Sequence, residues 1–289
     1  MARLNAARAA RRKAMNVIFI GLCLIATAIA LLALGMILWS LTTRGVAGMT
    51  WHVFTMETPA PDSDGGLINA IVGSILMCGV GMIIAVVIGV LAGTWLAEIG
   101  GDTPYGHALR FLNDVLLSAP SILVGVFVYG LMVYPSNPFS FNHYSGWAGA
   151  VALAVLATPV VTRTTEDILN LQPNALREAG MALGASQFTT IRKIIWRAAG
   201  AGLLTGGLLS FSRISGETAP LLNTALGNQF NNLDMSQPMA ALPLAIYNFA
   251  MSPYDTWNKL AWAGAFLVAV AVLGTNILGR WLARDKTNS

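Results

Sequence analysis

Two arginines stand inside apolar stretches of the chain, where a charged side chain is costly and usually functional. Arg163 lies in the run PVVTRTTED, and Arg213 lies in the run SFSRISGETAP. A guanidinium is always charged, and its planar fork of N–H donors matches the oxygens of a phosphate or a similar anion. Neighbouring hydroxyls can replace the hydration that such an anion loses on entering. These residue types predict an oxyanion path lined by Thr162, Arg163, Ser212, Arg213, Glu217 and Thr218.

A purely structural use of the same two arginines stays open. Residues three and four apart are neighbours on a helix, so Arg163 is spaced to meet Glu166 and Asp167. Arg213 is spaced in the same way to meet Glu217. In the structural interpretation Arg163 snorkels to the membrane edge and Arg213 joins helices through Glu217. In the functional interpretation Glu217 holds Arg213 until the anion displaces it, which keeps binding weak enough for release.

The composition indicates the elements that must position these side chains. The chain is 55% hydrophobic and only 10% charged, whereas soluble domains carry about 25% charged residues. Apolar runs of about 20 residues cross a bilayer as helices. The sequence therefore predicts an all-α integral membrane protein with six transmembrane helices. The expected spans cover residues 16–41, 67–97, 115–134, 147–169, 198–222 and 260–282.

The distribution of basic residues predicts the orientation of these spans. A formal charge of +4 could suggest nucleic acid in a soluble protein, but here Lys and Arg flank apolar spans. They gather in the tail 1–15, in the loop 173–197 and in the tail 283–289, whereas the segment 42–66 is acidic. Because basic loops stay in the cytoplasm, we expect both termini there. The predicted surroundings are membrane lipids, with no nucleic-acid partner.

The loop 173–197 differs in kind from the others. Pro173 can begin a helix, and Gly184 interrupts the apolar pattern at a conformationally permissive position. We expect a short helix, a bend, and a second helix that runs into the fifth span. One interpretation is an interfacial helix on the lipid head groups. The other is a docking helix for a cytoplasmic partner, and the residue pattern favours neither.

A family resemblance bears on this choice. The string Glu178-Ala179-Gly180, followed after three residues by Gly184, resembles the E-A-A-x-x-x-G loop of ABC-transporter permeases. Gly180 departs from that form, since Ala is common there. In that family the loop is a coupling helix that inserts into a groove of the ATPase subunit. The resemblance implies the same role for Arg177, Glu178, Ala179, Gly180, Leu183 and Gly184.

Longer strings narrow the resemblance. SRISGETAPLL, PVVTRTTED and SAPSILVGVFVY resemble the PstA-type permease subunits of phosphate-specific ABC transporters, and the likeness covers roughly residues 67–282. It implies a type I ABC importer permease of the MetI-like fold, located in the bacterial inner membrane, with inorganic phosphate as cargo. It also implies three partners: a PstC-type permease that forms a heterodimer with this chain, a PstB-type ATPase dimer, and a PstS-type phosphate-binding protein. A permease for sulfate or molybdate, and a non-conducting signalling subunit, stay open as alternatives.

The energy source must lie outside this chain. A phosphate-binding P-loop needs G-x-x-x-x-G-K-[ST], and none of the four lysines follows a glycine. The three histidines fall outside the apolar spans and are distant from one another, and the two cysteines read as packed thiols. We expect a transporter subunit that is not an enzyme, with no cofactor or metal of its own. ATP and Mg²⁺ would be bound by the partner ATPase.

Overall fold

The computed structural model describes residues 2–135, 140 and 142–285. Met1 and residues 286–289 of the predicted C-terminal tail lie outside the described residues. Helices build this part of the chain, and one isolated bridge joins Leu226 to Met239. The helices are α1 (Ala2–Gly48), α2 (His52–Thr55), α3 (Ile68–Trp95), η1 (Leu96–Gly100), α4 (Pro104–Ser118), α5 (Ser121–Met132), α6 (Gly146–Asn170), α7 (Asn174–Ala182), α8 (Gln187–Thr190), η2 (Ile191–Ile195), α9 (Trp196–Ala198), α10 (Gly200–Ile214), α11 (Ala219–Thr224), α12 (Leu242–Ala250) and α13 (Asp255–Asp285).

The pair α3 and α6 forms the centre of the bundle. Three glycines of α3, at positions 81, 89 and 93, face α6. A Cβ on Gly93 would lie 2.5 Å from the carbonyl oxygen of Thr162, so only glycine permits this approach. Small residues allow close helix packing in membranes, and Gly89 and Gly93 are spaced by four residues, on one face of α3. Met77 and Leu153 fill the core beside this contact.

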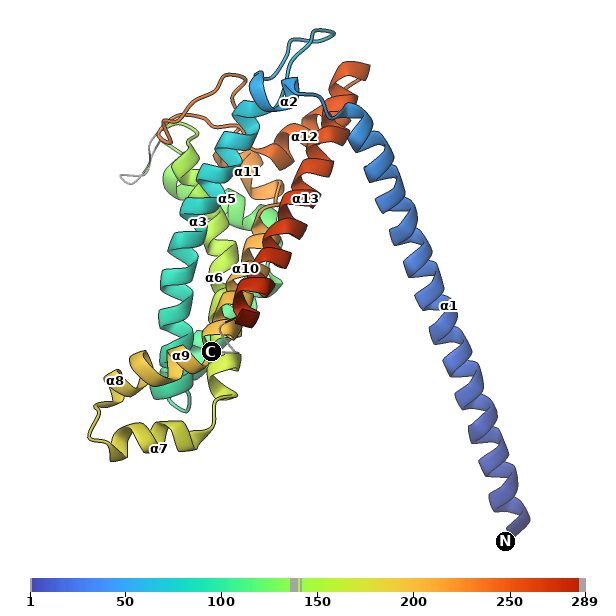
Figure 1. Ribbon diagram of the computed structural model, residues 1–289, viewed down its shortest axis with the longest axis vertical. Helices are drawn as coiled ribbons and strands as arrows, with labels where there is room; N and C mark the ends of the chain where they lie inside the picture. The colour runs from blue at the N-terminus through green and yellow to red at the C-terminus, as the bar shows by residue number, and fades with distance from the viewer. Residues whose placement is uncertain (1, 136–139, 141, 286–289) are drawn as a thin grey trace.

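Four helices are long and apolar enough to cross a membrane within the described residues: α1, α3, α6 and α13. Two bent pairs bring the number to six if each pair counts as one span. The chain then alternates between the α12 end of the bundle and the α7 end, which lie at the top and bottom of Figure 1. The first residues of α1 and the last residues of α13 lie toward the α7 end.

The third expected span, 115–134, is broken rather than continuous. Helix α4 ends at Ser118, α5 begins at Ser121, and the two meet at 107°. Pro120 lacks an N–H and disfavours a helical conformation at the preceding residue, and Ala119 is indeed extended, with ψ 135°. The apolar run therefore contains two half-helices instead of one.

The fifth expected span, 198–222, is broken twice. The α8–α9 segment and α10 meet at 72° next to Ala199. Helix α10 then ends at Ile214, and the short α11 begins after Thr218 with Pro220 in its first turn. Pro220 is suited to a helix start, and Gly216 is conformationally permissive, so the sequence disfavours one unbroken helix here.

Helix α1 diverges from the rest of the bundle (Figure 1). It contains the expected span 16–41, and it continues without a break through the basic residues of the tail 1–15 from Ala2 onward. Its contact with the bundle is confined to its last turns, where Gly45 and Gly48 lie against Phe266 and Lys259 of α13. The apolar side chains of its middle are exposed in the isolated chain.

Candidate functional site

The loop between α6 and α10 forms a protrusion at the α7 end of the bundle (Figure 1). It has the expected order of a short helix, α7, a bend, and a second helical segment from α8 to α9. Gly184 makes the bend with φ +80°, a left-handed conformation that glycine adopts without strain. Ser186 then caps α8 by accepting from the Thr189 N–H.

The outward surface of this protrusion is apolar as well as charged. Leu183 is 87% exposed, Phe188 is 70% exposed and Met181 is 53% exposed. Glu178 and Ala179 are exposed beside them, whereas Gly180 is buried against Thr190. Large exposed apolar side chains at a loop tip mark an interaction surface. Of the residues predicted to contact an ATPase, Glu178, Ala179, Leu183 and Gly184 lie on this surface.

Arg177 lies differently, because its guanidinium points inward. It forms a bidentate pair with Glu98 of η1, with Nη2–Oε1 at 2.7 Å and Nε–Oε2 at 2.9 Å. The two side chains are 19% and 5% exposed. The hydrogen bond to Glu98 raises the pKa of the Arg177 guanidinium above its ordinary value. Arg177 thus joins two parts of this chain, and Glu98 is a partner that the sequence analysis missed.

A second ion pair lies close to the same end of the bundle. Arg110 of α4 donates through Nε to Glu166 of α6 at 2.7 Å, and through Nη1 to the Gly101 carbonyl. The Glu166 side chain is 6% exposed. The expectation that Glu166 pairs with Arg163 is therefore wrong. Within the described part of the chain, Arg163 instead pairs with Asp167, at 3.5 Å, and both side chains are about half exposed.

The expected pair between Arg213 and Glu217 is also absent among the described residues. The spacing of four residues brings side chains together only on a continuous helix. Helix α10 ends at Ile214, and the chain turns before Glu217, so that geometry is lost. Arg213 is exposed in the isolated chain, and Glu217 is partly buried.

The two arginines lie on one side of the α6–α10 pair. On α6, Val161 and Thr165 face α3. Arg163 is two residues from each of them, about 200° around the helix, and therefore points away from α3. On α10, Phe211 packs against the cluster that includes Met77 and Cys78 of α3, and Arg213 is again two residues away. Both guanidiniums thus leave the bundle on the side opposite α3.

Contacts between α6 and α10 give the spacing of the arginines along the helices. Ser210 Oγ donates to the Ala157 carbonyl, and Gly206 lies beside Thr164. Arg163 is therefore level with Gly206, and Arg213 lies seven residues further along α10. At 1.5 Å per residue, the positions of Arg163 and Arg213 are about 10 Å apart along the helix axis.

The three hydroxyls predicted beside the arginines have other surroundings. Thr162 is buried near α3 and donates to the Thr158 carbonyl at 2.9 Å. Ser212 donates to the Leu208 carbonyl and accepts from Asn276 of α13. Thr218 precedes α11, and its carbonyl accepts from the Leu221 N–H. In this conformation the arginines, rather than the hydroxyls of Thr162 and Ser212, are available to an anion.

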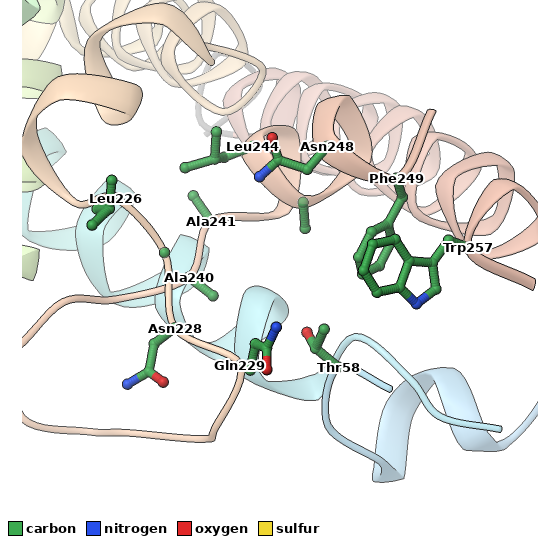
Figure 2. A pocket seen from close by; sticks show the side chains of 12 residues that line it. Thr58, Leu226, Asn228, Gln229, Ala240, Ala241, Leu244, Asn248, Phe249 and Trp257 are labelled. Carbon is green, nitrogen blue, oxygen red and sulfur yellow. The ribbon is translucent and has the colours of Figure 1, made fainter. Parts of the chain in front are cut away.

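A cavity of about 320 Å³ lies at the opposite, α12 end of the bundle (Figure 2). Its wall combines amide side chains with aromatic rings and carries no lysine or arginine. The lining therefore lacks the guanidinium groups that define the arginine path. Its polar and aromatic lining includes Thr58, Asn228, Gln229, Asn248, Phe249 and Trp257.

Comparison with known proteins shows the family of this chain. Residues 85–288 match the family described as "Binding-protein-dependent transport system inner membrane component". The chain is 51% identical over 275 residues to "Phosphate transport system permease protein PstA" of Haemophilus influenzae, covering 95% of this chain and 96% of that protein. It is 33% identical to "Probable phosphate transport system permease protein PstA" of Methanocaldococcus jannaschii, covering 90% of each.

The fold has a solved counterpart. One chain of the inward-facing MetNI methionine ABC transporter superposes with a TM-score of 0.62 at 20% identity, covering 76% of this chain and 95% of that chain. The likeness confirms the expected MetI-like permease fold.

Proposed function

This chain belongs to the family of binding-protein-dependent transport system inner membrane components, and we propose that within it the chain forms the PstA-type half of a phosphate importer. The observation that carries the proposal is the identity of 51% over 95% of the chain to a phosphate transport permease. A relative at this level over the whole length shares its permease role, and the chain is a membrane subunit rather than an enzyme. The ATPase of such a system is a separate subunit.

The arginines give this assignment a physical basis. Arg163 and Arg213 are exposed on one side of the α6–α10 pair, about 10 Å apart along it. We expect a second, PstC-type permease to cover that side and to complete the path. Each guanidinium can donate two parallel hydrogen bonds to phosphate oxygens. Asp167, 3.5 Å from Arg163, competes with the anion for the guanidinium and so keeps binding reversible.

The direction of the path follows from the distribution of charge. We infer that the α7 end, with the basic loop 173–197 and both termini, lies in the cytoplasm, because basic segments stay there. The α12 end then faces outward, where a PstS-type binding protein would deliver phosphate. This orientation corresponds to a multi-pass protein of the bacterial inner membrane.

The protruding loop is the proposed site of energy input. Its exposed Leu183, Phe188 and Met181 form an apolar knob of the kind that docks into a groove. We propose that a PstB-type ATPase dimer binds this knob, and that ATP and Mg²⁺ are held entirely by that partner. Closure of the ATPases would displace α7 and switch the bundle between outward-open and inward-open forms.

Neutral substitution of the two arginines tests the path. The double variant Arg163→Gln with Arg213→Gln should abolish ATP-dependent phosphate uptake in liposomes while the complex still assembles. Arg44→Gln is a matched control, because Arg44 lies on α1 over the Trp262 ring, away from the path. Normal uptake by the double variant would refute the role of these arginines, whereas the family membership would stand.

A further inference from the structure

Glu98 occupies a singular position in the bundle, at the junction between a membrane helix and the protruding loop. It lies in η1, a π-helical turn that continues α3 at the α7 end. π-turns inside helices are frequent at functional sites. The Glu98 side chain is only 5% exposed, so its carboxylate needs a counter-charge, which Arg177 of α7 supplies.

The Arg177 guanidinium is shared among three elements. In addition to the bonds to Glu98, Nη2 donates to the Leu169 carbonyl at 2.8 Å and Nη1 donates to the Gln172 carbonyl at 2.7 Å. Leu169 lies in the last turn of α6, and Gln172 lies in the turn that follows this helix. One side chain of α7 therefore holds the ends of both central membrane helices.

The second half of the loop is fastened to the same place. Gln187 Nε2 donates to the Glu98 carbonyl at 3.2 Å, and Trp196 Nε1 donates to Thr94 Oγ1 of α3 at 3.1 Å. By contrast, the connection onward to α10 passes through a 72° bend. The loop is thus joined to α3 and α6 by side-chain hydrogen bonds, and to α10 by a bent connection along the chain.

We propose that the Glu98–Arg177 pair is the joint that makes α3 and α6 follow α7 when a partner ATPase displaces it. The inference rests on the proposed function, since it assumes that the exposed face of α7 is where force enters. The Arg177 guanidinium is turned toward Glu98 and the end of α6, so we assign it to this joint and not to the docking surface. Glu98 and Arg177 are positioning residues, and their effect is on how much phosphate each ATP turnover moves.

The bidentate geometry explains why the joint is stiff. Two parallel N–H to carboxylate bonds fix both distance and orientation, whereas a single bond allows rotation. The Glu98 carboxylate is only 5% exposed, so water has little access to replace a bond that it loses. Loosening the pair should therefore leave ATP hydrolysis running while α3 and α6 lag behind α7.

The test uses the complete complex with its partner subunits, reconstituted in liposomes, and measures phosphate uptake and ATP hydrolysis together. Glu98→Gln keeps the shape but removes the charge and one acceptor, and Arg177→Lys keeps the charge but loses the bidentate fork. We expect the phosphate moved per ATP to fall about tenfold in each, the equilibrium equivalent of one charge-assisted hydrogen bond. ATP hydrolysis should stay close to the wild-type rate.

Asp102→Asn is the matched control. Asp102 is an exposed carboxylate four residues from Glu98, and it makes no side-chain hydrogen bond or ion pair among the described residues. Its substitution removes the same charge and should leave the ratio unchanged. An unchanged ratio of phosphate moved per ATP in Glu98→Gln would refute the proposed role of the pair. Failure of both Glu98→Gln and Arg177→Lys to assemble would also refute it, because the pair would then be a requirement of folding. Absence of uptake in the wild-type complex would instead count against the proposed function.

Discussion

Gly180 stands where related loops commonly carry alanine, and the structure gives a reason that can be tested. A Cβ at this position would lie 2.8 Å from both Cγ2 and Oγ1 of Thr190, and 2.9 Å from Cδ1 of Ile194. Thr190 is 3% exposed, so it has little room to move. The substitution Gly180→Ala should therefore push α7 away from α8 and η2.

The expected magnitude follows from two opposed effects. Alanine gains about 1 kcal/mol over glycine from helix propensity in α7. Overpacking a filled site costs about 1–3 kcal/mol. The net result is a loss of up to about 2 kcal/mol in the single variant. Thr190→Ala removes both clashing atoms, and it also removes a buried hydroxyl that has no hydrogen-bond partner, so alone it should be nearly neutral.

The assay is a double-mutant cycle on the melting temperature of the purified complex. We expect Gly180→Ala to lower it, Thr190→Ala to change it little, and the double variant to recover most of the loss. The coupling should amount to at least about 1 kcal/mol. Strict additivity of the two substitutions would refute the packing argument.

Three further substitutions test other parts of the account. Gly93→Ala should destabilise the complex by about 1–3 kcal/mol, because its Cβ would lie 2.5 Å from an α6 carbonyl oxygen. Gly79→Ala is the control and should not destabilise it, because the space around Gly79 is open. Melting curves of the two variants compare them directly. Gly184→Ala places a Cβ at φ +80° and should cost about 1–2 kcal/mol, visible as reduced thermal stability, with Gly184→Asn milder. Glu166→Gln leaves Arg110 without its buried counter-charge and should lower the yield of assembled complex. The loss of folding stability should lie near the lower end of about 3–5 kcal/mol, because Arg110 is partly exposed. A normal yield would contradict the importance of that pair.

Much of the fold was predictable because bilayer length and apolar runs constrain it. The spans at α3, α6 and α13 were predicted within a few residues. The order of helix, bend and helix in the loop followed from Pro173 and Gly184, whose backbone preferences act locally. The break at Pro120 was missed because the apolar run around it has the length of one continuous span.

The candidate site was harder to predict because its ion pairs join distant parts of the chain. Glu98 and Arg177 are 79 residues apart, and Arg110 and Glu166 are 56 apart. Spacing rules on one helix reach only three or four residues, so they assigned Glu166 to Arg163. The available signal was that Glu98 and Arg110 flank the turn after α3, where unpaired charges next to a span are costly.

The central claim is that this chain is the phosphate-conducting half of an ATP-driven importer. It is tested most directly by uptake of radiolabelled phosphate into liposomes that contain the chain with its permease, ATPase and binding-protein partners. The account predicts ATP-dependent accumulation that unlabelled phosphate suppresses and sulfate does not, and that is lost when this chain is omitted. Accumulation without this chain, or a preference for sulfate, would contradict it.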